Sequence, residues 1–253
     1  MNKKVSAKLQ SRLNMFRDLG YQLTSKAMIM DFGCGSGATV QELRSLGYQS
    51  FGCDFEFKQE KGIDTEALAT QGLIRLVDIQ PYKLPFDYDT FDVVISDQVF
   101  EHVQDYPESI SEINRILKPD GFCLHVFPAR YKLIEPHVYV PLATVVRSSP
   151  WLYIWAALGI RNEHQGGLSV RDTVDRNKSY LSAHTNYLPK QRIREYFREY
   201  FSEVDFCEKL FLKYSARGRR VYALSKYLPF LSALYSAVHS RVVYAGKPVK
   251  NPE

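Results

Sequence analysis

Residues 27–40 read AMIMDFGCGSGATV, and the fold of the chain can be predicted outward from this stretch. Residues 28–30 form a short apolar run that is typical of a buried parallel strand, and Asp31 follows it directly. A glycine-rich turn comes next, after which apolar residues at every third position indicate one face of a helix. Glycine lets the backbone approach a ligand closely, and a helix start presents free N–H groups. The turn therefore predicts a site for a nucleotide-like ligand at its glycines, Gly33, Gly35 and Gly37.

The glycine turn alone does not decide which ligand binds. It also fits the dinucleotide pattern G-x-G-x-x-G/A through Gly33, Gly35 and Ala38, so a nicotinamide dehydrogenase remains an alternative. A second short strand, Gln49–Asp54, ends in an acid 17 residues after Gly37. In nucleotide-binding folds a carboxylate at this position accepts hydrogen bonds from ribose hydroxyls. We therefore expect this acid to bind a ribose.

The composition favours one globular domain. With 253 residues, of which 45% are apolar, the chain can bury a large core. The four cysteines lie far apart and form no C-x-x-C pair, which is typical of reduced thiols in a cytosolic protein. The first residues lack the apolar segment of a secretory signal, and no run reaches the ~18 apolar residues that span a bilayer. We therefore expect a cytoplasmic location.

Positive charge is concentrated near the C-terminal end. From Lys209 to Pro252 the chain has nine Lys or Arg residues and no Asp or Glu, although the net charge of the whole chain is only +5. A basic segment with aromatic residues can face anionic lipid, nucleic acid or a phosphorylated substrate, and a solvated basic face explains it equally well. The apolar run Leu228–Val238 would suit an interfacial helix, so peripheral contact with a membrane surface is one hypothesis.

Strand and helix patterns alternate along the first half of the chain. This alternation is typical of βαβ units and predicts an α/β fold with a doubly wound, mostly parallel sheet. Residues 128–186 break the rhythm, and a segment of this length is typical of a lid or a substrate-recognition insertion. Strands are expected over 28–31, 49–54, 73–77, 91–95, 122–127, 204–212 and 241–246. Helices are expected over 5–19, 40–46, 64–70 and 228–238, from Asp105, and from Pro189 through Phe201.

Several motifs follow one another in a fixed order. They are DFGCGSG at 31–37, Asp54, Asp78-Ile79, LPF at 84–86, FDVVIS at 91–96, EHV at 101–103 and LKPDGF at 117–122. In this order and spacing the chain resembles the class I S-adenosylmethionine-dependent methyltransferases, specifically the small-molecule type that includes the quinone-biosynthesis C-methyltransferases. The resemblance is strong over residues 27–127 and returns weakly in RVVYAGKP near the end.

The resemblance implies an architecture and a cofactor. The sheet would be a Rossmann-like, seven-stranded methyltransferase sheet, with an insertion after strand five and a helical insertion before the last strand. The cofactor would be S-adenosyl-L-methionine. A single domain over 1–253 would comprise a leading helix (1–26), a cofactor-binding core (27–127), a substrate or lid insertion (128–186) and C-terminal helices and strands (187–253).

The resemblance also implies roles for individual residues in cofactor binding. Carboxylates at strand ends can accept hydrogen bonds from the amine, the ribose and the exocyclic nitrogen of the cofactor. Asp31 and the turn of Gly33, Gly35 and Gly37 would hold the methionine end, and Asp54 the ribose. Phe55 would line the adenine slot, Asp78 would accept from the adenine amino group beside Ile79, and Asp97 and Gln98 would lie near the reacting methyl group.

The insertion offers candidates for the acceptor site. His137, in the sequence Glu135-Pro136-His137, follows strand five, where a pocket at the carboxyl ends of the strands should open, and it has a pKa range that suits a general base. A structural hydrogen-bonding role is the alternative for this histidine. Weaker candidates for lining the pocket are Tyr139, Trp151, His184 and Tyr187.

Two further features of the sequence leave alternatives open. Glu101-His102 is typical of the family, yet capping and packing the following helix would explain it as well as catalysis. The histidines lie too far apart for a local ligand motif, so no metal site is predicted, although convergence in the fold is left open.

The function expected from these features is methyl transfer from S-adenosylmethionine to a small-molecule acceptor or to one linked to a lipid or sugar. One alternative is a tRNA-modifying methyltransferase, since the C-terminal segment is basic, but no RNA-binding module supports it. Another is a non-catalytic subunit that keeps the fold for binding. No DNA partner is expected, and the sequence indicates neither the acceptor nor the oligomeric state.

Overall fold

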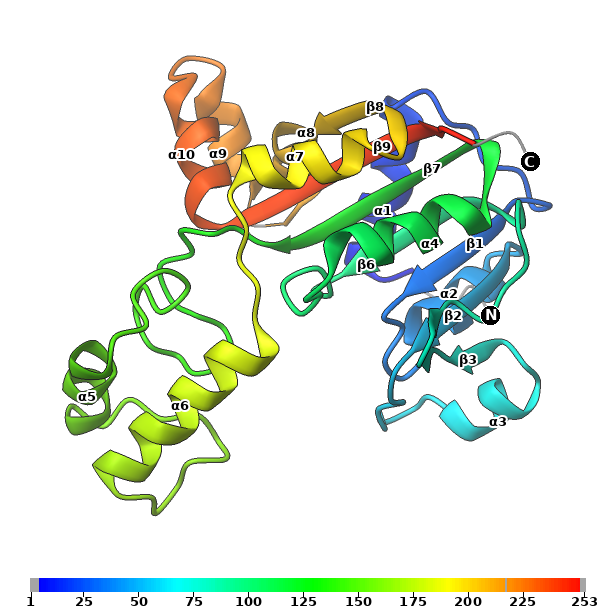
Figure 1. Ribbon diagram of the computed structural model, residues 1–253. Coiled ribbons are helices and arrows are strands. Elements are labelled where there is room, and N and C mark those ends of the chain that lie inside the picture. Colours follow the sequence, from blue (N-terminus) through cyan, green and yellow to red (C-terminus); the bar gives the residue numbers. More distant parts are fainter. Residues whose placement is uncertain (1–4, 217, 251–253) are drawn as a thin grey trace.

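The computed structural model, which describes residues 5–216 and 218–250, has a seven-stranded sheet at its centre (Figure 1). Its strands are β1 (Met28–Phe32), β2 (Gln49–Asp54), β3 (Ile74–Leu76), β6 (Phe91–Asp97), β7 (Leu117–Pro128), β8 (Phe201–Phe206) and β9 (Ser240–Pro248). Their order across the sheet is β3-β2-β1-β6-β7-β9-β8. The first five run parallel, whereas β9 lies antiparallel to both β7 and β8. The mostly parallel, seven-stranded sheet expected from the sequence is confirmed.

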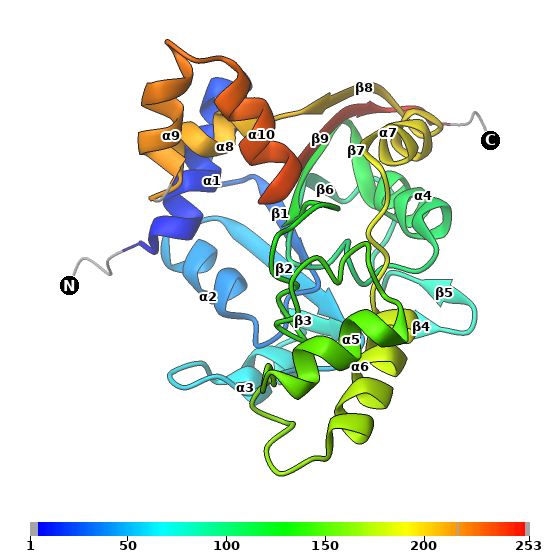
Figure 2. The same cartoon turned by 90° about the vertical axis from the view of Figure 1, so that its left-hand side faces the viewer.

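Helices cover both faces of this sheet, as a doubly wound fold requires (Figure 2). On one face lie α4 (Tyr106–Ile116) and α7 (Lys190–Arg198), and on the other lie α1 (Ala7–Asp18), α2 (Ala38–Ser45) and α8 (Glu208–Tyr214). Ile113 and Phe197 belong to the first core, and Phe16 and Leu43 to the second. The short helix α3 (Thr65–Thr70) packs at the β3 edge of the sheet.

The carboxyl ends of the central strands bring the predicted acids to one edge of the sheet. The chain leaves β1 toward β2 and later returns to β6 on the other side of β1, so the connections diverge at this edge. Asp31 pairs in register with Gly52 of β2 and with Ile95 of β6. Asp54 and Asp97 each lie two residues further along, and all three acids therefore meet at the same edge.

The insertion after β7 contains two helices with a core of their own. Helices α5 (Ser149–Ala157) and α6 (Val170–His184) pack together around residues such as Leu152 and Leu181 and project away from the sheet (Figure 1). The sequence pattern did not reveal α6 because its buried face is partly polar. Asn177 is fully buried there and accepts a hydrogen bond of 2.5 Å from Gln165.

The C-terminal part confirms the helical insertion before the last strand but corrects two boundaries. Helices α8, α9 (Gly218–Ser225) and α10 (Phe230–Val238) separate β8 from β9. The strand predicted over Val204–Leu212 is wrong beyond Phe206, because its second half belongs to α8. Short apolar runs fit either period, and here packing against α1 selects the helix. Phe201, predicted to lie in a helix, begins β8 instead.

A small antiparallel pair lies apart from the main sheet. It consists of β4 (Asp78–Ile79) and β5 (Tyr82–Lys83), in a stretch where the sequence pattern predicts no strand.

Candidate active site

The glycine turn joins β1 to α2, and glycine is found at its three positions for different structural reasons. All three have positive φ angles, of 76°, 54° and 82° for Gly33, Gly35 and Gly37. A Cβ at Gly33 would lie 2.4 Å from the side chain of Val99, and one at Gly37 would lie 2.8 Å from Leu68. A Cβ at Gly35 would meet only Lys58, at 3.9 Å. Gly33 and Gly37 are therefore required by packing, whereas Gly35 leaves space for a ligand to approach the backbone.

Two adjoining cavities lie over this turn. One of about 300 Å³ is lined by Gly33, Gly35 and neighbouring residues, and one of about 660 Å³ extends between α1 and the start of α2. Both are lined by Asp31, Thr39 and Asp97, so these residues stand between the two spaces. Volumes of this size suit a cofactor or a small ligand.

Asp31 is buried at this junction, and its environment disfavours negative charge. Burial is the main cause that raises the pKa of Asp31 to about 7, and the charges of Asp97 and Asp54 act in the same direction. Lys8 and a hydrogen bond from Thr39 oppose the shift. A cationic group bound in the cavity would restore the ionised carboxylate.

Asp97 has cationic partners that sequence reasoning missed. Its carboxylate lies 2.5 Å from the guanidinium of Arg12 and 3.6 Å from the amine of Lys8, both on α1. The two cations are four residues apart and so share one side of the helix. The amphipathic pattern of residues 5–19 indicates where α1 packs, but it gives no sign that Lys8 and Arg12 reach Asp97, which lies 85 residues beyond Arg12 in the chain.

Asp54 is tied to the glycine turn. One of its carboxylate oxygens accepts a hydrogen bond of 2.7 Å from the N–H of Gly35, and the other accepts one of 2.8 Å from the N–H of Phe55. Each oxygen keeps a second lone pair, so Asp54 could still accept from a ribose hydroxyl. The bond also fixes the backbone of Gly35 toward the cavity.

The structure does not bring all the predicted cofactor residues into these two cavities. Phe55 and Ile79 are 53% and 66% exposed, so the expected adenine slot is an open surface bordered by Asp78. Gln98 is also exposed, with a positive φ of 60°, and its N–H donates to Val126. Neither cavity is lined by these four residues or by Asp54.

Glu101 is buried in a way that demands explanation. It is fully buried just beyond β6, and neither carboxylate oxygen has a hydrogen-bond partner among the described residues. Helix α4 is capped by Asp105 instead, so the capping role considered for Glu101 is not observed. Burial is the main cause that raises the pKa of Glu101 to about 8. Buried carboxylates without partners are rare, and each one demands a reason, such as a proton on the carboxyl group, a bound water or a bound ion.

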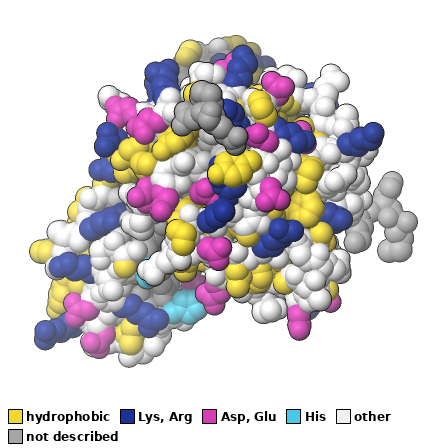
Figure 3. Space-filling view, turned by 45° about the vertical axis from the view of Figure 1, so that its right-hand side comes forward, with side chains coloured by type: hydrophobic (Ala, Val, Ile, Leu, Met, Phe, Trp, Pro, Cys, Tyr) yellow, Lys and Arg dark blue, Asp and Glu magenta, His cyan; other side chains and the backbone are white. Residues whose placement is uncertain are grey.

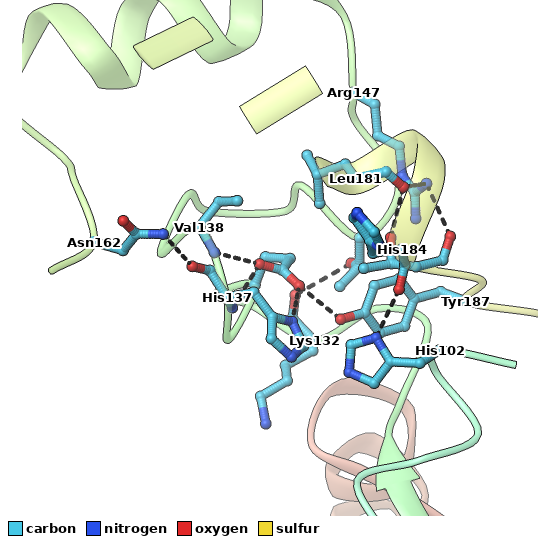
Figure 4. Close-up of polar contacts among 12 residues, drawn as sticks. His102, Lys132, His137, Val138, Arg147, Asn162, Leu181, His184 and Tyr187 are labelled. Atoms are coloured by element: carbon cyan, nitrogen blue, oxygen red, sulfur yellow. Dashed lines mark hydrogen bonds and ion pairs between the residues drawn. The ribbon is translucent and has the colours of Figure 1, made fainter. Parts of the chain in front are cut away.

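Two histidines face this carboxylate, and both have a defined tautomer. One ligand atom each from Glu101, His102 and His137 lies within 4.8 Å of the others. The Nδ1 of His102 lies 2.6 Å from the carbonyl oxygen of His184, and the Nδ1 of His137 lies 2.8 Å from a carboxylate oxygen of Glu135 (Figure 4). These partners are acceptors, so each Nδ1 carries the proton and each Nε2 keeps a lone pair.

Glu135 fixes the loop that carries His137. It is fully buried and accepts hydrogen bonds of 2.7 Å from the N–H groups of His137 and Val138 and from the hydroxyl of Tyr187. Burial raises the pKa of this carboxyl, but the bonds from His137, Val138 and Tyr187 outweigh it, and the net pKa is lowered. Glu135 is therefore an ionised support for His137.

The remaining candidates in the insertion differ in position. His137 and Tyr139 line a separate cavity of about 330 Å³, together with residues around 162–165 and Tyr180. Trp151 donates its indole N–H to the carbonyl of Pro141, and the Tyr187 hydroxyl is held by Glu135, so both have structural roles. The ring of His184 packs against Tyr180, with ring centroids 5.1 Å apart.

Lys58 acts on His102 and also belongs to a cavity over the glycine turn. Burial lowers the pKa of His102, and the positive charge of Lys58 adds to this effect. Lys58 also lines the 300 Å³ cavity over the glycine turn. Histidine side chains reach the surface on the face shown in Figure 3.

Comparison with known proteins shows which domain the chain resembles. Residues 30–125 match the profile described as a methyltransferase domain. A demethylmenaquinone methyltransferase of Staphylococcus aureus is 27% identical over 155 residues, which cover 57% of this chain and 64% of that protein. A sterol 4-C-methyltransferase of Caenorhabditis elegans is 27% identical over 103 residues, covering 40% of this chain and 30% of that protein. The matched part thus spans less than two thirds of these relatives.

Solved structures share the fold at lower identity. Phosphoethanolamine N-methyltransferase 2 of Haemonchus contortus, in complex with S-adenosyl-L-methionine, has a TM-score of 0.51 and 20% identity, covering 95% of this chain and 53% of that chain. Geranyl diphosphate C-methyltransferase of Streptomyces coelicolor has a TM-score of 0.50 and 15% identity, covering 95% and 79%. The fold of the chain is therefore that of these solved methyltransferases, and residues 30–125 match a methyltransferase domain. In sequence, the chain is similar to small-molecule methyltransferases such as the two relatives above.

Proposed function

We propose that this protein transfers a methyl group from S-adenosylmethionine to a small-molecule acceptor, which a lipid or sugar can carry. The observation that carries the proposal is the glycine turn with its unfilled approach at Gly35, combined with Asp31, Asp54 and Asp97 at one sheet edge. A non-catalytic scaffold would have no need of this combination. The two curated relatives act, by their names, on demethylmenaquinone and on a sterol.

The residues present fit the methionine end of the cofactor. Its carboxylate would meet Lys8 and Arg12, which already approach Asp97, and its ammonium would meet Asp31 and Asp97. The ribose would lie against Asp54, and the adenine against Phe55, Asp78 and Ile79. When bound, S-adenosylmethionine supplies an electrophilic methyl group on a sulfonium centre.

The chain's contribution to the reaction would be positioning and exclusion of water. The insertion, residues 128–186, places the loop of His137 beside the carboxyl edge, where an acceptor can be held between the insertion and the sheet. We propose that His137 acts as a general base as long as its Nε2 binds no ion, and Glu135 would stabilise the protonated ring.

Transfer of labelled methyl groups tests this function. The purified chain is incubated with methyl-labelled S-adenosylmethionine and a fractionated cell extract, and label is expected in the small-molecule or lipid fraction. Asp54→Ala should reduce transfer roughly 10- to 100-fold at limiting cofactor, because hydrogen bonds to a charged group contribute about 1.5–3 kcal/mol. The control variant is Asp120→Ala, which removes an exposed acid near the start of β7. Label in tRNA would favour the tRNA-modifying alternative, and no label in any fraction would favour a binding subunit.

The second part of the proposal concerns where the protein works. We place it in the cytoplasm, in peripheral contact with an anionic membrane surface through α9 and α10. No residue of α10 is buried, and Leu228, Phe230 and Leu234 are 47%, 61% and 56% exposed. The segment Lys209–Pro252, which includes α9 and α10, has Lys and Arg but no Asp or Glu, and its positive charge complements anionic lipid. None of the described helices is long and apolar enough to cross a bilayer.

Vesicle flotation tests the membrane contact. The protein is expected to float with phosphatidylglycerol vesicles at low salt and to be released as salt screens the charges. The triple change Leu228→Glu, Phe230→Glu and Leu234→Glu should abolish flotation. The matched triple change Tyr153→Glu, Ile154→Glu and Leu158→Glu, at exposed apolar positions of the insertion, should leave it intact. The membrane contact would be refuted if the wild-type protein did not float with the vesicles. It would also be refuted if Leu228, Phe230 and Leu234 mediated only self-association.

A further inference from the structure

We infer that Glu101, His102 and His137 form a binding site for one divalent transition-metal ion, with zinc as the best-suited candidate. The three side chains converge from two parts of the fold: Glu101 and His102 follow β6, and His137 comes from the insertion. Their ligand atoms lie within 4.8 Å of one another. The inference does not depend on methyl transfer, because metal binding is measured without cofactor or acceptor.

The first observation that supports an ion is the state of Glu101. A fully buried carboxylate whose two oxygens both lack a hydrogen bond among the described residues is poorly compensated for its lost hydration, although the N–H of its own backbone favours the ionised form. Lys132 attracts it electrostatically but forms no ion pair with it in the described part of the chain. An ion ligated by this carboxylate would remove the deficit.

The second observation is that the hydrogen bonds of both imidazole rings leave one nitrogen of each ring available to an ion. In each ring Nδ1 is held by an acceptor, His184 O for His102 and Glu135 for His137, which leaves Nε2 free to ligate. A carboxylate behind a ligating histidine is a common support in metal sites, since it fixes the ring and increases its basicity. Glu135 is itself fixed by Val138 and Tyr187, so this support is rigid.

The donor set selects the class of ion. Two imidazole nitrogens and one carboxylate suit Zn²⁺ and other first-row divalent ions, whereas Mg²⁺ and Ca²⁺ prefer oxygen ligands throughout. Zinc bonds of about 2.0–2.2 Å hold ligand atoms roughly 3.3–3.6 Å apart, so side-chain adjustments of about 1 Å would close the site. Three protein ligands leave a coordination position open.

An ion here would connect the insertion to the cofactor-binding core. It would also change the role of His137, because a ligating Nε2 cannot act as a general base. The open position would face the region between the insertion and the sheet edge, where the acceptor is proposed to lie.

Calorimetric titration of the metal-stripped full chain with ZnCl2 tests the site, with CoCl2 absorption spectra as an independent readout of coordination. One ion per chain is expected, bound with micromolar or tighter affinity, and MgCl2 should give no saturable binding. Glu101→Gln and His137→Ala should each weaken zinc binding at least 100-fold. Glu135→Gln should weaken it 10- to 100-fold through its support of His137.

The control variant is His164→Ala, which removes an exposed histidine of the insertion that pairs with Glu163. It should bind zinc like the wild type. Circular dichroism of each variant verifies that it is folded, and Glu101→Gln keeps the shape of the side chain. Zinc binding that survives Glu101→Gln, that is lost equally in His164→Ala, or that is absent in the wild type would overturn the inference and leave Glu101 as a protonated structural residue.

Discussion

Asp31→Asn is expected to stabilise the protein at pH 8 and at the same time to weaken its binding of S-adenosylhomocysteine. The pKa of Asp31 is about 7 in the folded protein, chiefly because of burial, against 3.8 as the ordinary value. The folded state therefore holds this proton more tightly than the unfolded state. Its contribution to stability is present below pH 3.8 and is lost as the pH rises through 7.

The size of the effect follows from the same shift. Each pKa unit corresponds to about 1.36 kcal/mol, so the ionised carboxylate costs a few kcal/mol above pH 7. Removing the charge should raise the free energy of unfolding at pH 8 by roughly 2–4 kcal/mol, or the melting temperature by about 5–15 °C. At pH 4 the difference between variant and wild type should fall below about 1 kcal/mol.

Binding should respond in the opposite direction. The amide lacks the charge that would pair with the cofactor's ammonium group, so the dissociation constant for S-adenosylhomocysteine should rise roughly 10- to 100-fold, or about 1.4–2.8 kcal/mol. Thermal unfolding at pH 4 and 8, together with calorimetric titration at pH 8, measures both effects. A variant that is less stable than the wild type at pH 8, or that binds equally well, would contradict the assignment of Asp31.

Gly35→Ala is expected to abolish most cofactor affinity while leaving a folded protein. The φ angle of 54° disfavours alanine by about 1–2 kcal/mol, but the new Cβ meets only Lys58, at 3.9 Å, and so has room in the empty site. The methyl group would instead occupy the space through which a ligand approaches the backbone. Affinity for S-adenosylhomocysteine should fall at least about 10-fold, as titration calorimetry would show.

Gly72→Ala is the matched control for this change. Gly72 also has a positive φ, of 69°, and its added Cβ meets nothing within 4 Å, but it lies at the end of α3 and lines neither cavity. The two variants should lose similar stability, and only Gly35→Ala should lose binding. Equal affinities in both variants would show that the turn does not contact the ligand.

The proposed cofactor side of the site can be predicted from the sequence because its signals are local. The strand, glycine turn and helix of residues 27–40 lie next to one another in the chain, and parallel strands bring Asp31, Asp54 and Asp97 to one edge. Lys8 and Arg12 could not be predicted, because their contact with Asp97 depends on how α1 packs across the sheet.

The histidine cluster shows a second limit of the sequence. Glu101 and His102 belong to a motif typical of the family, and the sequence offers His137 as a separate candidate, but only the fold brings the three together. No local spacing signals this convergence, and burial of a carboxylate without partners cannot be read from residue types. The helix α8 was missed for a related reason: packing against α1 decides between periods that a short apolar run leaves ambiguous.

Thermal unfolding of the wild-type protein with S-adenosylhomocysteine, and with NAD as the alternative ligand, tests the cofactor assignment most directly. One site at about 100 times its dissociation constant contributes roughly 2.7 kcal/mol. At about 2–4 °C per kcal/mol for a chain of this size, S-adenosylhomocysteine should raise the melting temperature by roughly 5–11 °C, and NAD should leave it unchanged. No shift with S-adenosylhomocysteine, or a shift with NAD instead, would contradict the account.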